Sequence, residues 1–299
     1  MTDWDVYLVT QESLSGDRTT PAVVEAAIAG GVDVVQLREK DVSARERYEM
    51  GREVRELTRE AGVPLIVNDR VDLALALEAD GVHLGDEDLP VSVARELLGE
   101  DAIVGRSVSF VEDARGAERA GADYLGVGAI YATGSKDDID EAEYAIGTDR
   151  LAEIVDAVDI PVVGIGGIGA DNAGEVIEAG AEGVAVITAI TGADEAAAAT
   201  RGLAATVANA RFDDEPFSRA PTHETAVRDA TRRAIARFDG DVEIQVRTRW
   251  RPLQGSGLQA GLVVGPSPPD DVDVHAATVA VPVDAATGTA PATPNWTLP

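Results

Sequence analysis

Residues 162–169 read VVGIGGIG, and residues 183–190 read GVAVITAI. Each stretch opens with a nearly continuous apolar run, mostly β-branched, which is typical of a parallel strand buried on both faces. Between them, residues 170–179 have helical spacing and are followed by Gly180, and glycine is common just past the C-terminus of a helix. This part of the sequence therefore predicts a strand–helix–strand unit.

The same alternation extends back to the N-terminus. Helix-length segments such as 42–61, 91–98 and 150–158 separate further short apolar runs. The predicted strands are 6–10, 34–38, 65–68, 81–85, 103–108, 124–130, 162–168 and 183–190. Eight strands alternating with helices in this length predict an α/β fold, a single (β/α)8 TIM barrel. Periodicity does not report closure of the sheet, so a doubly wound open sheet stays the alternative.

Composition divides the 299 residues into two parts near Ala210. Residues 1–210 hold 42 acidic and 16 basic side chains with four prolines, whereas residues 211–299 hold 12 and 9 with ten prolines. The first part is long enough for one domain with a sizeable core, and we assign the barrel to it.

Residues 211–299 have a different composition. Residues 224–238 have the spacing of one amphipathic helix, residues 242–249 alternate like a strand, and the rest is rich in Pro, Ala and Thr. This composition favours a C-terminal extension that is dispensable or partly disordered. A small accessory domain and a reading-frame artefact of a GC-rich gene are the alternatives.

The charge balance excludes several classes of partner. With 54 acidic and 25 basic residues the formal net charge is −29, which argues against nucleic acid or an anionic membrane surface. There are no cysteines and no long apolar run, so we expect a soluble, cytoplasmic protein. Lys40 and Lys136 are the only lysines, and this acid-rich, lysine-poor composition suggests a halophilic source. The sequence leaves open whether the protein forms a homo-oligomer.

Polar side chains follow several of the predicted strands, where barrel enzymes carry their active sites. Alternation directs Gln36, Arg38 and Lys40 to one side, and Lys136 comes after a later strand. These cations suit phosphate oxygens. Asn68, Asp69 and Asp88 also follow strands, and the two aspartates suit a Mg²⁺ ion that substrate phosphates help to hold. Taken singly, either aspartate is as well explained by a solvated surface charge or a helix cap.

A second anion site is predicted at residues 164–169, which read GIGGIG before a helix. Glycines let backbone N–H groups approach a phosphate, and the loops after strands seven and eight form the usual phosphate site of barrels. Ile187 and Thr188, after the last strand, would close the pocket. Two anion sites predict two phosphorylated small-molecule substrates.

The sequence resembles the thiamine-phosphate synthase family over nearly all of residues 1–210. The stretches that carry the resemblance occur in family order: YLVT at 7–10, QLREK at 36–40, VNDRVDLAL at 67–75, DGVHLGDEDLP at 80–90, ADYLGVGAIYATGSKDD at 122–138, GIGGI at 164–168 and VAVITAI at 184–190. Residues 211–299 have no counterpart in this resemblance.

The resemblance implies a transferase that joins 4-amino-5-hydroxymethyl-2-methylpyrimidine diphosphate to 4-methyl-5-(2-hydroxyethyl)thiazole phosphate, giving thiamine phosphate and pyrophosphate. It implies a dissociative mechanism in which a pyrimidine methylene cation is captured by the thiazole nitrogen. Such a reaction needs charge stabilisation and positioning rather than acid–base chemistry. A site of Arg, Lys and Mg²⁺ without a histidine dyad agrees with it.

Carried over by motif position, the resemblance also implies roles for single residues. The pyrimidine diphosphate would contact Gln36, Arg38, Lys40, Asn68, Ser107 and Lys136, with Arg38, Lys40, Ser107 and Lys136 as the catalytic set. Mg²⁺ would bind Asp69 and Asp88. The thiazole phosphate would contact Thr133, Ser135, Gly167, Ile187 and Thr188.

The chain departs from the family pattern at four positions. Ala129 and Ala132 stand where prolines are usual, which puts the closed geometry of that loop in question. Ser135 replaces a common threonine and Thr188 a common serine, and both exchanges keep a hydroxyl donor.

Two other functions compete with the synthase. A related thiazole tautomerase would use a histidine where this chain has Ser109, and a serine without a base is a poor proton-transfer group. A phosphate-binding barrel without catalysis, with residues 211–299 as its interaction module, would not require the two lysines and two aspartates.

Overall fold

The structure is a computed structural model that describes residues 4–40, 42–133 and 145–211, and the backbone of three later strands. The chain divides into two compact units, Met1–Ala210 and Arg211–Pro299. Within the described ranges, none of the helices is long and apolar enough to cross a membrane.

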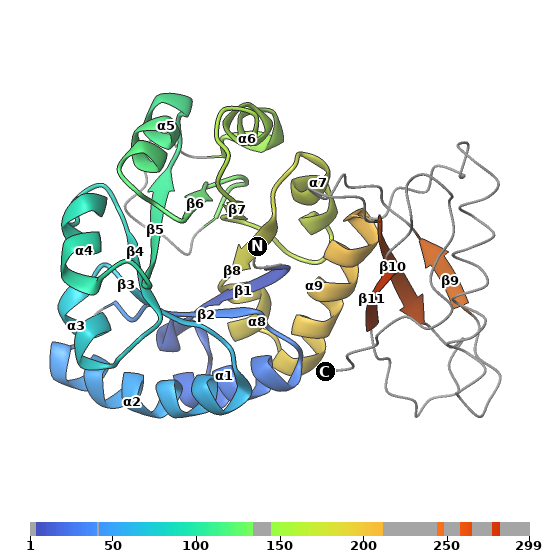
Figure 1. Cartoon of the computed structure of the whole chain (residues 1–299). Coiled ribbons are helices and arrows are strands. Elements are labelled where there is room, and N and C mark those ends of the chain that lie inside the picture. The colour runs from blue at the N-terminus through green and yellow to red at the C-terminus, as the bar shows by residue number, and fades with distance from the viewer. Residues whose placement is uncertain are drawn as a thin grey trace. The chain divides into compact units, whose positions relative to one another are not determined.

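Eight parallel strands of the first unit form a closed barrel (Figure 1). Each strand pairs with its neighbours in the chain, and β8 pairs back to β1 through Val6 and Val184. The strands are β1 Val6–Val9, β2 Val34–Leu37, β3 Leu65–Asn68, β4 Gly81–Leu84, β5 Ile103–Val108, β6 Tyr124–Val127, β7 Val162–Ile165 and β8 Gly183–Val186. Closure confirms the predicted (β/α)8 barrel and excludes the open sheet.

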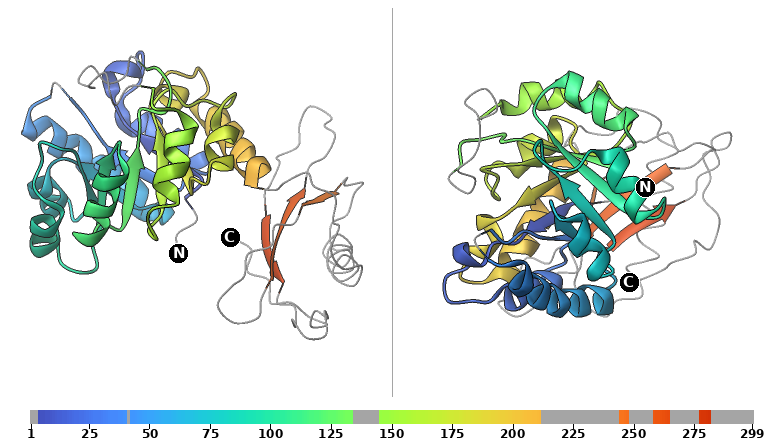
Figure 2. Two further views of the ribbon diagram at one scale, coloured as in Figure 1. Left: turned by 90° about the horizontal axis from the view of Figure 1, so that it is seen from above. Right: turned by 90° about the vertical axis from the view of Figure 1, so that its left-hand side faces the viewer.

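Helices surround the strands, as the views in Figures 1 and 2 show. They are α1 Thr20–Ala29, α2 Ala44–Ala61, α3 Val71–Ala76, α4 Val91–Leu98, α5 Val111–Arg119, α6 Gly147–Val155, α7 Ala173–Glu178, α8 Thr188–Thr191 and α9 Ala196–Arg211, with a 3-10 turn η1 at Glu12–Leu14. The ends of α2 follow local sequence rules: Ser43 and Glu46 form a capping box, and Gly62 ends the helix with a φ of 70°.

Three predicted strands extend three or more residues past the observed ends, and those predicted over 6–10, 34–38 and 81–85 extend one residue past. The predicted strand 183–190 ends at Val186, because the chain turns at Ile187 into the short helix α8. The predicted strand 162–168 ends at Ile165, because Gly166 and Gly167 adopt φ values of 100° and 64°. The strand predicted over 124–130 ends at Val127. Apolar residues beyond these ends pack as loop or helix residues, which periodicity alone did not separate from the strands.

Two apolar clusters result from the alternation of side chains along the strands. One lies between the sheet and the helices, and the other fills the barrel interior. The interior cluster consists of Trp4, Tyr7, Val9, Val34, Ile66, Tyr124, Val163 and Ala185. The barrel interior is therefore a packed core and not a pore, and the mouth at the carboxyl ends of the strands is where we expect ligands to bind.

Acidic residues join neighbouring strands at the N-terminal end of the barrel. Each stands just before an even-numbered strand and accepts a backbone N–H from the preceding strand. The pairs are Asp33 with Val6 at 2.8 Å, Asp80 with Leu65 at 2.7 Å, and Asp123 with Val104 at 2.7 Å. These bonds satisfy backbone N–H groups near the strand ends that the hydrogen bonds of the parallel sheet do not pair.

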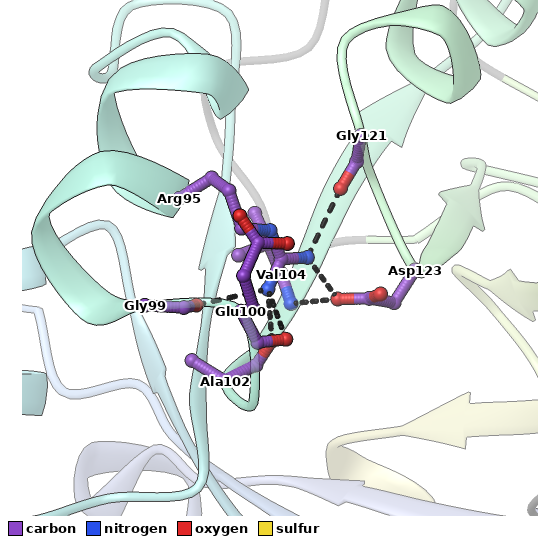
Figure 3. A network of polar contacts seen from close by, with 7 residues as sticks. All are labelled: Arg95, Gly99, Glu100, Ala102, Val104, Gly121 and Asp123. Carbon is purple, nitrogen blue, oxygen red and sulfur yellow. Dashed lines mark hydrogen bonds and ion pairs between the residues drawn. The ribbon is translucent and has the colours of Figure 1, made fainter.

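Arg95 of α4 binds one of these acidic residues, Asp123, and several backbone carbonyls near it (Figure 3). Its guanidinium donates to the carbonyls of Gly99, Glu100, Ala102 and Gly121, and to the Asp123 carboxylate at 2.5 Å. Its side chain is only 14% exposed. One side chain thus holds the C-terminal end of α4 against the entries to β5 and β6.

We expect Arg95→Ala to lower the free energy of unfolding by about 2–3 kcal/mol, because it leaves several polar partners unpaired and partly removed from water. Urea unfolding at constant salt measures this change. The matched control is Arg45→Ala, which breaks an exposed i,i+4 pair with Glu49 and should change stability by less than about 0.5 kcal/mol. Equal effects of the two substitutions would contradict the assignment.

The described part of the second unit is an antiparallel sheet of order β11-β10-β9. Its strands are β9 Ile244–Arg247, β10 Leu258–Val264 and β11 Ala277–Val281. β9 falls inside the strand predicted over 242–249, while β10 and β11 occur where composition predicted no regular element. The predicted helix 224–238 lies outside the described residues. The boundary of the extension and its dispensability stay predictions.

Candidate active site

Side chains from four strand ends converge at the mouth of the barrel. Gln36 of β2, Asn68 of β3 and Ser107 of β5 lie on the inward-facing alternation of their strands. Arg38 and Lys40 continue from β2, Asp69 from β3 and Asp88 from the loop after β4. The structure thus gathers most of the predicted diphosphate and metal residues at one edge.

The charged residues that follow β2, at positions 38–40, lie on two sides of the backbone. Arg38 is only 8% exposed, and its guanidinium donates to the side-chain oxygen of Gln11. Glu39, the residue between the two cations, is buried on the other side. It accepts from the Thr20 hydroxyl at 2.7 Å and from the Glu12 backbone N–H at 2.8 Å. Glu39 therefore anchors the loop that positions Arg38.

Sequence reasoning assigned no role to Glu39 or Gln11. Alternation was a usable signal for Glu39, because it places this residue opposite Arg38 and Lys40. No local pattern indicates Gln11, since its contact with Arg38 joins the loop after β1 to the loop after β2.

Asp69 and Asp88 form a carboxylate pair at the rim. Asp69 adopts a φ of 63°, and its backbone N–H donates to the His83 carbonyl at 2.8 Å. Asp88 accepts from the Gly85 N–H at 2.6 Å. Partial burial and then the charge and hydrogen bonding of Asp88 raise the pKa of Asp69 to about 6, while Arg38 and Lys40 act in the opposite direction. The two carboxylates thus repel each other next to two cations.

This donor set fits a hard divalent cation held partly by a ligand. The described residues contain no group of three or more His, Cys, Asp and Glu side chains that could hold a metal. Mg²⁺ is commonly bound by one or two carboxylates, with waters and substrate phosphates completing six positions. Burial and the nearby charge of Asp88 raise the pKa of Asp69. A bound cation would offset the repulsion between the two carboxylates.

Ser107 has a partner that sequence reasoning missed. Its Oγ lies 2.9 Å from Nε2 of His83, which points inward from β4 and is 9% exposed. The expected site of arginine, lysine and metal is therefore extended by a histidine. The signal available in the sequence was the position of His83 within an otherwise apolar strand, GVHL.

The glycine-rich turn after β7 meets the loop after β6. A Cβ on Gly167 would lie 2.7 Å from the Ala132 carbonyl oxygen and 2.8 Å from Cβ of Tyr131, so only glycine permits this approach. Asn172 braces the turn by donating to the Gly167 carbonyl at 3.0 Å and accepting from the Gly169 N–H at 2.8 Å. Consequently α7 begins at Ala173 rather than near residue 170.

The remaining predicted contacts of the thiazole phosphate are only partly described. Ile187 and Thr188 lie at the start of α8, a short helix after β8 of the kind that forms phosphate sites in barrels. Thr133 is half-buried at the end of the described loop. Ser135 and Lys136 lie outside the described residues.

Ser109 does not offer tautomerase chemistry. It is buried, and its hydroxyl donates to the Gly128 carbonyl at 3.0 Å. A hydroxyl engaged in this way is poorly placed to move protons of a bound ligand.

The fold and the site together define a (β/α)8 barrel of the phosphate-handling class, with charged residues at one edge of the mouth and a glycine-rich turn at the other. A family model described as thiamine monophosphate synthase matches residues 6–190. The chain belongs to this family of enzymes, which are transferases of thiamine biosynthesis.

Individual relatives agree with the family model. The thiamine-phosphate synthase of Haloarcula marismortui is 68% identical over 211 residues, which cover 71% of this chain and 100% of that relative. The thiamine-phosphate synthase of Natronomonas pharaonis is 65% identical over 202 residues, covering 68% and 94%. A solved thiamine phosphate pyrophosphorylase from Pyrococcus furiosus is 42% identical with a TM-score of 0.64, covering 70% of this chain and 98% of that one.

A second family model matches residues 193–295 and is described as a family of unknown function, DUF7284. The match begins just before α9, the last helix of the barrel unit, and continues through the three described strands of the second unit. Residues 211–295 thus resemble sequences found outside this chain, which argues against a reading-frame artefact.

Proposed function

We propose that the chain joins 4-amino-5-hydroxymethyl-2-methylpyrimidine diphosphate to 4-methyl-5-(2-hydroxyethyl)thiazole phosphate and releases thiamine phosphate and pyrophosphate. The observation that carries the proposal is the convergence of Arg38 and Lys40 with the carboxylates of Asp69 and Asp88 at one edge of the mouth. Two cations beside a metal-type carboxylate pair suit a diphosphate. Membership of the family supports the same pair of substrates.

The chemistry that this site can support is dissociative. The bond between the pyrimidine methylene carbon and the diphosphate oxygen breaks, and its electron pair leaves with pyrophosphate. The lone pair of the thiazole nitrogen then forms the new C–N bond with the methylene cation. No proton is gained or lost in either step, so the protein needs to stabilise charge and hold the nucleophile in line.

Each side chain has a defined part in this scheme. Arg38 offers a fork of donors to the diphosphate, while Lys40 and Lys136 supply compact charges. Mg²⁺, when bound by Asp69 and Asp88, would neutralise charge on the leaving group. Gln36 and Asn68 would orient the pyrimidine end of the substrate, and Ser107 would donate to the diphosphate.

The thiazole phosphate would bind on the opposite side of the mouth. Gly167, Ile187 and Thr188 would contact it from the turns after β7 and β8. Thr133 and Ser135 would complete the pocket from the loop after β6. This arrangement would separate the two anions and put the thiazole ring between them, where its nitrogen would reach the methylene carbon.

We further propose that the protein works in the cytoplasm at high salt, because its net charge of −29 leaves carboxylates that concentrated cations would screen. The assay is therefore run in multimolar KCl.

The test measures thiamine phosphate formed from the two purified substrates with Mg²⁺. We expect product from the full chain and from residues 1–211, because the whole length of the Haloarcula relative is matched by 211 residues of this chain and the barrel unit ends at Ala210. Lys136→Ala should lower the rate at least about tenfold. Absence of product from both folded proteins would contradict the proposal and favour the tautomerase or the non-catalytic binder.

A further inference from the structure

Hydrogen bonds link five side chains from five strands across the barrel interior. Nε2 of Gln36 lies 2.8 Å from Oη of Tyr7, and that Oη lies 2.8 Å from Oη of Tyr124. Oη of Tyr124 lies 2.9 Å from Nδ1 of His83, and Nε2 of His83 lies 2.9 Å from Oγ of Ser107. We call Gln36, Tyr7, Tyr124, His83 and Ser107 the interior chain.

Packing holds the interior chain in one geometry. A Cβ on Gly105 would lie 2.2 Å from the Tyr124 ring, and a Cβ on Gly126 would lie 2.9 Å from Cε1 of His83. Trp4 contacts the Tyr124 ring edge-on at 5.0 Å between centroids. Two glycines thus provide the space that the central rings occupy, and neither ring can shift freely.

The donors and acceptors define a direction along the interior chain. The amide nitrogen of Gln36 only donates, so Tyr7 accepts from it and gives its single proton to Tyr124. Tyr124 in turn donates to Nδ1 of His83. His83 therefore carries its proton on Nε2 and donates to Ser107. Burial raises the pKa of Tyr7 and Tyr124 above the ordinary value, so both hydroxyls keep their protons.

The two ends of the interior chain are the residues that face the mouth. At one end the amide nitrogen of Gln36 is committed to Tyr7, which leaves the amide oxygen as the group for a ligand. At the other end the Ser107 oxygen accepts from His83, which directs the hydroxyl proton elsewhere. One end is an acceptor and the other is a donor.

We propose that Tyr7, Tyr124 and His83 are positioning residues that set the hydrogen-bonding polarity of the substrate site. They make Gln36 an acceptor for the amino group of the pyrimidine and Ser107 a donor to the diphosphate. This inference rests on the proposed function for the identity of the ligand, but the polarity itself belongs to the free protein. No proton moves along the interior chain during turnover, so His83 acts as neither acid nor base.

Nitrogen-15 NMR of the full chain tests the polarity without any substrate. The chain has three histidines, and loss of one signal in His83→Gln assigns His83. We expect the Nε2–H tautomer in the natural sequence. Gln36→Glu removes the donating amide, so Tyr7 should donate to the new carboxylate, the direction should reverse, and the proton of His83 should move to Nδ1.

Asn172→Asp is the matched control, because it is also an amide-to-carboxylate change at this end of the barrel but lies outside the interior chain. It should leave His83 in the Nε2–H form. An Nδ1–H tautomer in the natural sequence, or no change of tautomer in a folded Gln36→Glu variant, would overturn the proposal.

Tyr124→Phe supplies a second test, because it keeps the aromatic ring and removes the hydroxyl that connects Tyr7 to His83. We expect the KM for the pyrimidine diphosphate to rise about tenfold while the KM for the thiazole phosphate changes less than about twofold. Thr58→Val, which removes a buried hydroxyl from α2, controls for loss of stability and should leave both KM values unchanged. An unchanged KM for the pyrimidine, or an equal rise in both, would contradict the assignment. If the natural sequence makes no product, the proposed function fails while the NMR result still decides the polarity.

Discussion

Asp69→Asn is expected to lower the rate of thiamine phosphate formation at least about a hundredfold and, at the same time, to stabilise the metal-free protein. The loss of rate follows because an amide oxygen binds Mg²⁺ more weakly than a carboxylate and does not balance its charge. The gain in stability follows because the substitution removes a carboxylate that repels Asp88. Asparagine also tolerates the φ of 63° at this position.

The stability effect should depend on pH in a defined direction. The pKa of Asp69 is raised from 3.8 to about 6, so the folded protein favours the protonated carboxyl. The cost of ionising Asp69 is therefore absent below about pH 3.8, grows as pH rises, and is complete above about pH 6. Because Asp69 is only partly buried and solvent screens part of the repulsion, we expect a difference of about 1 kcal/mol at neutral pH.

Thermal unfolding in EDTA across this pH range measures the difference between the variant and the natural sequence. Asp72→Asn is the control, because Asp72 forms an exposed pair with Arg70 and its pKa is lowered rather than raised. That substitution should leave the stability unchanged or reduced. A variant Asp69→Asn that is less stable than the natural sequence at neutral pH, or equally active, would contradict the assignment of the carboxylate pair.

Arg38→Ala is expected to reduce kcat/KM for the pyrimidine diphosphate by a factor of about 10²–10³. Arg38 is buried beside the mouth, held by Gln11, and its charge acts on Asp69. Removing Arg38 takes away a fork of donors for the leaving diphosphate. It also removes a positive charge that offsets the repulsion between Asp69 and Asp88. Arg38→Lys should recover only part of the loss, because an ammonium lacks the fork geometry.

The control for Arg38→Ala is Arg55→Ala. Arg55 is a partly buried arginine that pairs with Asp80 at 2.7 Å at the other end of the barrel. This variant should lose stability but keep its kcat/KM under conditions where it is folded. Steady-state kinetics with each substrate varied separately distinguish the two. Equal losses in both variants would show that Arg38 acts through the fold rather than through the substrate.

Much of the site could be predicted because it depends on local sequence. Short apolar runs specify the strands, and the carboxyl ends of parallel strands meet at one edge whatever the details of packing. That rule was sufficient to predict the cluster formed by Arg38, Lys40, Asp69 and Asp88. The ends of the strands were less well predicted, because apolar residues such as Ile168 and Ile190 remain buried after the strand has ended.

The sequence by itself determined the eight-fold alternation, the charge of the molecule and the residue types that follow each strand. Only the tertiary structure decided closure of the barrel and the contacts across its interior. Tyr7 and Tyr124 are 117 residues apart, and their hydroxyls meet because closure of the barrel lets inward side chains of β1 and β6 meet across its interior. His83 reaches Ser107 because β4 and β5 pair in one register and Gly126 leaves space for the ring. Register and space are properties of the assembled sheet, and no local pattern of residues contains them.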